Sequence, residues 1–288
     1  MLANRLKTIL PQIILENQNA FLSKRLITDH LVAFELMNYL EHKREGNEGF
    51  VVIKLDMSKA YDRVKWGFIK QVMEKMSFHE KWINLIMHCI TTISYFVLIN
   101  GVAYGSIIPT RGLRQGDIVS PYIFLLCAYG FSSLINDAAR NQRISGVSIC
   151  KGSPKITHLF FADDSLLFCK ANIQECQNLI NILQLYEASS GQKINANKSS
   201  VFFNNNTPDD RRCEVLDMLG PMQDTWHKKY LGLHLIIGKS KVEIFAKIKK
   251  KVEKKLLGWR EKILSVGGWE ILNKAVAQAI PTYTMSCF

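Results

Sequence analysis

The chain has 288 residues, of which 48% are hydrophobic and 22% charged, and its mean hydropathy is +0.01. This composition is typical of one or two globular domains and excludes a largely disordered chain. Seven scattered cysteines without a CxxC pair argue against a zinc site or a disulfide framework, and no run approaches the roughly 18 apolar residues of a membrane span. The net charge of +12 indicates a polyanionic partner such as nucleic acid, with a solvated basic surface as the alternative.

The first half of the chain predicts helices around one buried strand. Residues 1–45 are expected to be mostly helical, and the β-branched run GFVVIKLD (49–56) to form a buried strand. Two helical patterns follow at about 66–76 and 80–92. Two strand-like runs then flank Asn100-Gly101, a dipeptide preferred in two-residue hairpin turns.

A long helix is expected to begin with Ser120 as N-cap and Pro121 in its first position. Two short strands, ITHLFFA and SLLFCK, are then predicted around an acidic pair, followed by a helix that Gly191 closes. A strand in SSVFF, a helix with Thr207 as cap and Pro208 first, and a strand in KYLGLHLII come next. This order indicates an α+β fold, with helices on one face of an antiparallel sheet.

The C-terminal part of the chain is strongly basic. Ten Lys or Arg and three Glu lie between residues 239 and 262, where apolar residues recur at three- and four-residue steps. This pattern predicts an amphipathic helix with one basic face. Helices are expected to continue beyond it, with a break at Gly267-Gly268. The basic face is expected to bind backbone phosphates; its candidate residues are Lys247, Lys250, Lys251 and Lys254.

The acidic pair Asp163-Asp164 interrupts an apolar hairpin, HLFFADDSLLFCK. Its simplest interpretation is a turn that faces water, since Asp is common in turns. Two adjacent carboxylates between buried strands instead favour a cleft that binds a divalent cation, and oxygen ligands without nearby His or Cys suit Mg²⁺ or Mn²⁺. Asp56, at the end of the predicted strand 49–56, is the candidate third ligand for two ions.

Five blocks occur in order along the chain: KLDMSKAYDRVKW, RGLRQGDIVSPYIFLLC, HLFFADDSLLF, GQKINANKSSVFF and KYLGLHL. Together they resemble the reverse transcriptase domain of LINE-type (non-LTR) retrotransposons of the plant type. The resemblance implies a right-hand polymerase with partial fingers at 1–48, a ferredoxin-like palm at 49–238 and the start of a helical thumb at 239–288. A fingers-like insertion is expected around 64–118. We expect the chain to be truncated at both ends relative to the family.

The resemblance also implies roles for single residues. Asp56, Asp163 and Asp164 match the catalytic, metal-binding triad of the family, and Tyr61 matches the aromatic residue that lies beneath the incoming sugar. The other nucleotide-binding positions that the resemblance implies are Gln115, Gly116, Lys198 and Arg25. The residues themselves also allow purely structural roles. These are a core aromatic for Tyr61, a simple turn for Gln115-Gly116, and solvated side chains for Lys198 and Arg25.

The implied function is RNA-directed DNA synthesis, with an RNA template, a DNA primer and dNTP as partners and two Mg²⁺ or Mn²⁺ ions as cofactors. No protein partner is indicated, and the chain is expected to be intracellular, either nuclear or cytoplasmic. Ile118 and Val119 depart from the family's usual Pro and Leu. The alternative is a catalytically inactive, nucleic-acid-binding remnant, and we expect the isolated chain to bind primer–template and extend it poorly. A third possibility is a phosphoryl-receiver-like domain, whose acidic pocket also holds Mg²⁺, but the order of the five blocks argues against it.

Overall fold

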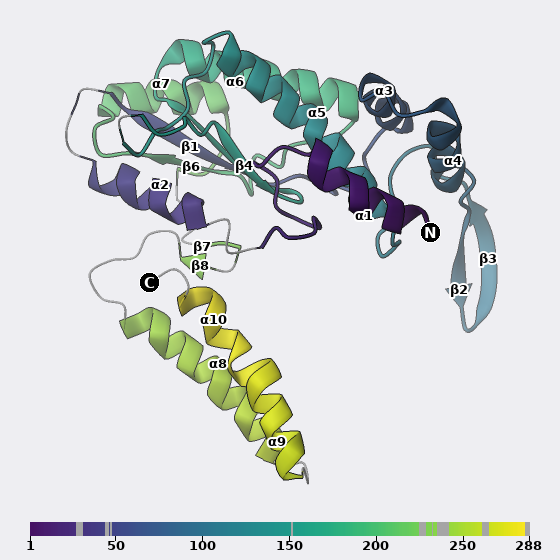
Figure 1. The fold of residues 1–288 in the computed structure, drawn as a ribbon. Coiled ribbons are helices and arrows are strands. Elements are labelled where there is room, and N and C mark those ends of the chain that lie inside the picture. Colours follow the sequence, from purple (N-terminus) through teal and green to yellow (C-terminus); the bar gives the residue numbers. More distant parts are fainter. Residues whose placement is uncertain are drawn as a thin grey trace. The chain divides into compact units, whose positions relative to one another are not determined.

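The computed structural model describes residues 1–26, 31–43, 46, 48–150, 152–224, 229–231, 233–234, 242–260 and 265–285. The chain divides into two compact units (Figure 1). The first comprises residues 1–26 and 43–226, and the second comprises residues 27–42 and 227–288.

A four-stranded antiparallel sheet forms the centre of the first unit. Its strands are β1 (Phe50–Leu55), β4 (His158–Phe161), β5 (Asp164–Lys170) and β6 (Ser200–Phe203), in the spatial order β4-β5-β1-β6. Helix α5 (Ser120–Arg140) ends the long connection from β1 and leads into β4, and α6 (Ile173–Ser190) connects β5 to β6. This β-α-β-β-α-β order with this strand arrangement is ferredoxin-like, as the sequence resemblance predicts.

The sheet packs its helices against one face, as Figure 1 shows for α5, α6 and α7 (Asp209–Leu219). Every second residue of β1, namely Val51, Ile53 and Leu55, enters the core formed with these helices. Lys54 therefore belongs to the opposite face of the sheet. Asp56, two residues further on, continues that opposite face.

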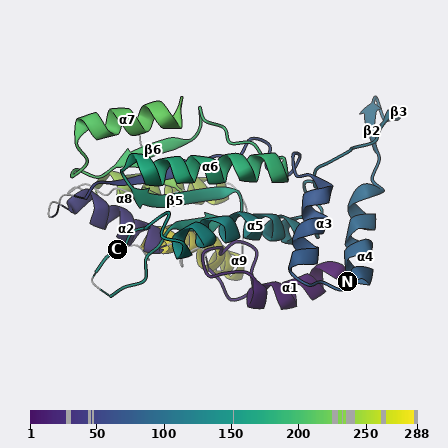
Figure 2. The same ribbon diagram turned by 90° about the horizontal axis from the view of Figure 1, so that it is seen from above.

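A second core lies around the first half of α5. Helices α1 (Leu2–Ile13), α3 (Trp66–Lys75) and α4 (Glu80–Thr91) supply its other side chains. In Figures 1 and 2, α3 and α4 lie side by side at this end of α5. The helical patterns predicted at 66–76 and 80–92 are thus confirmed to within one residue.

Two helix starts differ from the prediction by one residue. Val119 is the N-cap of α5 and Pro208 that of α7, rather than Ser120 and Thr207. The hydroxyl of Ser120 donates to Asp117 Oδ2 (3.3 Å), and that of Thr207 donates to an asparagine side chain (2.8 Å). Both hydroxyls are therefore engaged outside the helices that they were expected to cap. The end of α6 is confirmed, because Gly191 closes it with φ 77°.

The predicted hairpin is confirmed as β2 (Tyr95–Ile99) and β3 (Val102–Ile107), joined by Asn100 (φ 49°) and Gly101 (φ 83°). Positive φ at both turn residues is what a type I′ turn requires. The hairpin forms a two-stranded sheet of its own, and its apolar side chains are exposed, with Leu98 70% accessible. The ribbon carries no charged residue.

The second unit contains α2 (Leu31–His42), β7 (Lys229–Tyr230), β8 (Leu233–His234), α8 (Val242–Arg260), α9 (Val266–Leu272), a π-helix (Asn273–Ala277) and α10 (Ala279–Met285). The single strand predicted in KYLGLHLII is wrong over residues 229–234. These residues form two short antiparallel strands, because Leu231 takes a turn conformation with φ 48°. Residues 235–237 lie outside the described residues.

The predicted break at Gly267-Gly268 is also wrong, because both glycines lie in the first turn of α9. Ser265 caps this helix, and its hydroxyl accepts a hydrogen bond from the Gly268 backbone N–H (3.2 Å). The expectation that residues 1–45 are mostly helical fails between 14 and 26, where the chain runs without a helix.

One described helix, α5, is long and apolar enough by composition to cross a membrane, but 56% of its most apolar stretch is buried within the protein. Its side chains contribute to both hydrophobic cores. These contacts are typical of the core helix of a globular domain.

A buried histidine joins α5 to the sheet. His158 is fully buried, with Nε2 2.7 Å from the Ser132 hydroxyl and Nδ1 2.9 Å from the Thr157 hydroxyl. Burial lowers the pKa of His158 from 6.5 to about 3, so the ring is neutral in the folded protein at neutral pH.

This histidine predicts an acid-sensitive fold. Because the folded pKa is depressed, the neutral ring contributes its full stability above pH 6.5, and that stability is lost as pH falls toward 3. The free energy of unfolding should fall by up to about 1.4 kcal/mol per pH unit in this range. Urea unfolding at pH 7.5 and 5.0 measures the effect, with His158→Gln as the comparison. An equal pH dependence in both proteins would show that another group is responsible.

Candidate active site

Strand register brings two of the predicted acids to one place. The last pair of the β1–β5 ladder is Leu55 with Ser165, so the next step sets Asp56 opposite Asp164. Directly opposite residues of an antiparallel pair point to the same face. Asp163 occupies the two-residue turn between β4 and β5, beside Ala162 with φ 56°. Asp56 and Asp164 therefore share the face opposite the helices, and Asp163 lies next to Asp164 at the same end of the β1–β5 pair.

The electrostatics of Asp164 reflect this crowding. Burial raises the pKa of the Asp164 carboxyl first, and the negative charges of Asp163 and Asp56 raise it further, while Lys54 opposes them. The site thus concentrates negative charge that the protein neutralises only in part. Such a site is stabilised by a cation.

The donor set fits a hard divalent cation, because it consists of carboxylate oxygens on adjacent backbone positions. Within the described ranges, no three His, Cys, Asp or Glu side chains are already close enough together to hold an ion. Asp163 is exposed, and Asp56 and Asp164 are half-buried.

Tyr61 lies beside these acids. Its ring stacks on Phe124 of α5, with centroids 4.7 Å apart and planes 14° apart. Burial, and then the charge of Asp163, raise the pKa of Tyr61 to about 12. The phenol is therefore neutral at physiological pH, half-buried, and next to the acidic turn.

The segment that leads into the predicted nucleotide-binding turn, Gln115-Gly116, is hydrogen-bonded to the segment that contains Tyr61. The Leu113 N–H donates to the Tyr61 carbonyl, and the Gly112 N–H donates to the Val64 carbonyl, both at 2.8 Å. Gln115 and Gly116 (φ 83°) form an exposed turn two residues further on. This geometry leaves their backbone accessible beside Tyr61.

Lys198 lies in a turn that is tied to Asp56. The Asn195 N–H donates to the Asp56 carbonyl (2.8 Å), and the Asp56 N–H donates to the Ser199 hydroxyl (3.1 Å). Lys198 itself is exposed between these two anchors. The turn thus carries a lysine close to the backbone of the first acid.

Arg25 has a structural role that the sequence did not reveal. Its two terminal nitrogens donate to four backbone carbonyls at the end of α1 and just beyond, at distances of 2.5–3.5 Å. These carbonyls belong to Pro11, Ile14, Leu15 and Gln18. The guanidinium therefore satisfies carbonyl groups at the end of α1 that have no partner within the helix. A contact between Arg25 and a triphosphate stays a prediction.

Gln18 supports the acidic turn and was missed by sequence analysis. Its side-chain oxygen accepts hydrogen bonds from the N–H groups of Ala162 (3.1 Å) and Ala20 (3.0 Å). The residue is only 3% exposed, so this link is shielded from water. Nothing in the local sequence signals it, because the two segments are more than 140 residues apart.

The lysines of α8 fall on one face, since positions 247, 250, 251 and 254 are spaced at three and four residues. Lys250, Lys251 and Lys254 are exposed. The side chain of Lys247 lies outside the described residues. A neighbouring lysine, Lys249, forms an ion pair with Glu253 (3.8 Å).

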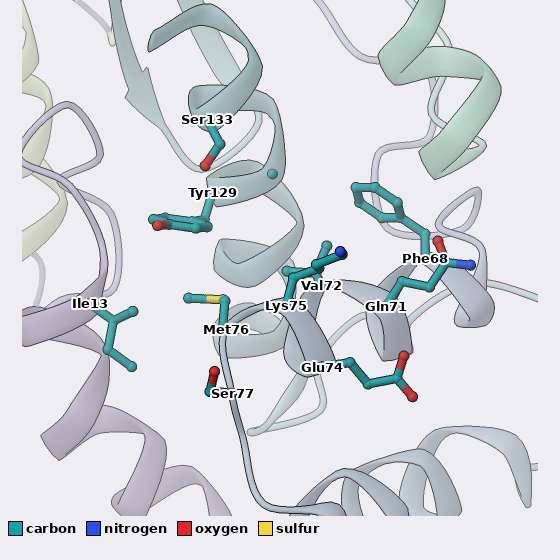
Figure 3. Close-up of a pocket in the computed structure, with 11 residues that line it drawn as sticks. Ile13, Phe68, Gln71, Val72, Glu74, Lys75, Met76, Ser77, Tyr129 and Ser133 are labelled. Carbon is teal, nitrogen blue, oxygen red and sulfur yellow. The ribbon is translucent and has the colours of Figure 1, made fainter. Parts of the chain in front are cut away.

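Cavities in the first unit lie both next to the acidic turn and away from it. A small one of about 10 Å³, which has room for one water molecule, lies beneath the acidic turn and is lined by Asp163, Ser165 and Gln192 among others. A larger one, about 800 Å³, lies between α1, α3 and α5 (Figure 3). Its lining includes Ile13 and Tyr129 but none of the three acids, so it is separate from the acidic site.

The fold is that of a right-hand polymerase. The telomerase of Candida tropicalis, solved in complex with a fragment of telomeric RNA, superimposes with a TM-score of 0.56 over 88% of this chain and 41% of its own, at 14% identity. The telomerase of Candida albicans gives a TM-score of 0.51 over 99% of this chain and 47% of its own, at 15% identity.

The family model described as "Reverse transcriptase (RNA-dependent DNA polymerase)" matches residues 1–235, and the chain belongs to this family. The predicted resemblance and polymerase class are thereby confirmed.

Two of the similar proteins come from non-LTR retroelements. The chain is 26% identical to the 149 kDa protein of transposon TX1 from Xenopus laevis over 98% of its own length. It is 27% identical to a Pol polyprotein of element R2 from Popillia japonica over 57% of its length. A mitochondrial protein of Arabidopsis thaliana is 47% identical over 24% of the chain. The chain spans 21%, 22% and 56% of these three proteins, respectively.

Proposed function

We propose that this chain copies RNA into DNA, extending a DNA primer with dNTP by two-metal nucleotidyl transfer. The observation that carries the proposal is the gathering of Asp56, Asp163 and Asp164 at one end of the β1–β5 pair. Transfer of a nucleotidyl group depends mainly on positioning and on neutralising charge. Carboxylates that repel one another, with Asp163 exposed at the β4–β5 turn, are suited to that task.

The three aspartates would hold two Mg²⁺ or Mn²⁺ ions, which when bound activate the primer 3′-hydroxyl and stabilise the leaving pyrophosphate. Tyr61 limits the space next to the sugar with its stacked ring. The Gln115-Gly116 turn presents backbone groups to the nucleotide, and Lys198 supplies positive charge near the departing pyrophosphate.

The proposed division of labour follows the right-hand plan. Residues 1–48 contribute to the fingers, 49–238 form the palm with an insertion around 64–118, and 239–288 begin the thumb. The lysine face of α8 holds the template–primer by its phosphates.

The second candidate function is binding of primer–template without catalysis. It is favoured by the absence, within the described part of the chain, of three acidic side chains already placed to hold an ion. In that case the basic helix acts alone and the acids remain solvated.

Primer extension on poly(rA)·oligo(dT) separates the two candidates. We expect slow dTTP incorporation by the isolated chain, which requires Mg²⁺ or Mn²⁺, is stopped by EDTA and falls to background in Asp163→Asn. A gel-shift assay on the same substrate reports binding independently. Binding that persists while wild type and Asp163→Asn incorporate equally little would refute catalysis and support the second candidate.

A further inference from the structure

Two segments far apart in sequence run alongside each other next to the acidic site. Residues 190–195, at the end of α6 and beyond, lie antiparallel to residues 56–65. Their backbones are joined by Asn195 N–H to the Asp56 carbonyl, Ser58 N–H to the Lys193 carbonyl, and Lys65 N–H to the Ser190 carbonyl, each at 2.8 Å. The segment that bears Tyr61 is therefore held at intervals by residues 190–195.

Gln192 is the buried side chain of this arrangement. It is only 2% exposed, and its Nε2 donates to the carbonyl of Ala60 at 2.7 Å. Its own N–H donates to the hydroxyl of the fully buried Ser190 at 3.1 Å. The Tyr61 carbonyl accepts from Leu113 N–H on the other side. The backbone of Tyr61 is thus fixed both before and after its side chain.

The oxygen of the Gln192 side-chain amide has a different environment from its nitrogen. Its Oε1 is buried and has no hydrogen-bond partner among the described residues. The residue belongs to the lining of the small cavity that also contains Asp163 and Ser165. That cavity has room for one water molecule, so the hydrogen bond from Nε2 to Ala60 is the contact by which Gln192 acts on the Tyr61 segment.

We propose that Gln192 is a positioning residue that sets the place of the Tyr61 ring relative to Asp163, and through it the selection of deoxyribonucleotides over ribonucleotides. The proposal rests on the proposed function for the sugar discrimination. The link from Gln192 to the Ala60 carbonyl rests on the geometry alone. Loss of the link frees the Ala60–Tyr61 peptide while leaving the metal-binding acids in place.

Gln192→Met keeps the length of the side chain and removes the donor. In primer extension we expect the KM for dUTP to rise and the preference for dUTP over UTP to fall by about threefold to tenfold, the range of one lost hydrogen bond, with kcat changing less than KM. Gln177→Met is the matched control, because Gln177 lies on the exposed side of α6 and bonds only to Asn181 (3.0 Å) among the contacts seen. Its selectivity should equal that of wild type.

Gln192→Glu gives a second readout that simple destabilisation does not mimic. The carboxyl group that this substitution introduces can donate a hydrogen bond to the Ala60 carbonyl only while it is protonated, which requires low pH. Selectivity in this variant should therefore approach that of wild type as pH falls and diverge as pH rises. A pH-independent ratio in Gln192→Glu, or unchanged selectivity in Gln192→Met, would overturn the proposal.

Hydrogen–deuterium exchange tests the positioning without catalysis. Residues 57–66 should exchange faster in Gln192→Met than in wild type or Gln177→Met, while peptides from the core of α5 should not change. Unchanged exchange at 57–66 would refute the positioning role. If the wild-type chain incorporates no nucleotide, the proposed function fails by itself, and the exchange result still decides whether Gln192 holds the Tyr61 segment.

Discussion

Replacing Asp163 or Asp164 with Asn is expected to lower nucleotide incorporation about a thousandfold or more without lowering the free energy of unfolding. The expected loss of activity follows from removing one carboxylate of the proposed metal site at the end of the β1–β5 pair. Initial rates of dTTP incorporation with saturating Mg²⁺ measure it. Asp137→Asn, which alters an exposed acid paired with Arg143 (2.6 Å), is the control and should retain activity.

The stability of Asp164→Asn should equal or exceed that of wild type at pH 7. Burial and the charges of Asp163 and Asp56 raise the pKa of the Asp164 carboxyl, so its ionised form is destabilising. A raised folded pKa means that wild-type stability increases as pH falls through that pKa. Urea unfolding at pH 7 measures the comparison. A large loss of stability in Asp164→Asn would show that the carboxylate has a structural role, and full activity would remove it from the catalytic site.

Reversing the charges of Lys250, Lys251 and Lys254 to Glu should weaken binding to an RNA–DNA duplex by about tenfold or more at low salt. The magnitude of the slope of log K against log salt should fall by up to about 3, since each lysine that neutralises a phosphate contributes about 0.9. These side chains are exposed on one face of α8. Fluorescence anisotropy at several salt concentrations measures both quantities.

A matched variant separates this local effect from net charge. Lys7, Lys70 and Lys81 are also exposed, on α1, α3 and α4, and their reversal to Glu changes the total charge equally. We expect this variant to retain most of the salt slope. Equal effects of the two triple substitutions would show that net charge, rather than the face of α8, drives binding.

Local sequence patterns were sufficient to predict most strands of the sheet. The apolar run of β1 and the turn residues Asn100-Gly101 encode their own conformations, and both elements were predicted correctly. The sequence of β1 also predicted an acid at its end, because Asp56 follows directly. Local sequence patterns alone do not predict that Asp56 lies opposite Asp164, because strand register depends on pairing between distant segments.

Long-range hydrogen bonds account for most of what was missed. Arg25, Gln18 and Gln192 each satisfy backbone groups at remote positions, and no short-range pattern marks such a partner. The error at residues 229–234 has a different cause. Alternating apolar residues predict a strand, but the positive φ of Leu231 reverses the chain there.

The central place of β1 in the sheet also sets the timing of folding during synthesis. Its two neighbours, β5 and β6, are translated about a hundred residues or more after it. At common rates of synthesis this delay lasts roughly 5–30 s, during which an apolar strand has two unpaired edges. The sheet that carries the acids therefore begins with its central strand and closes late.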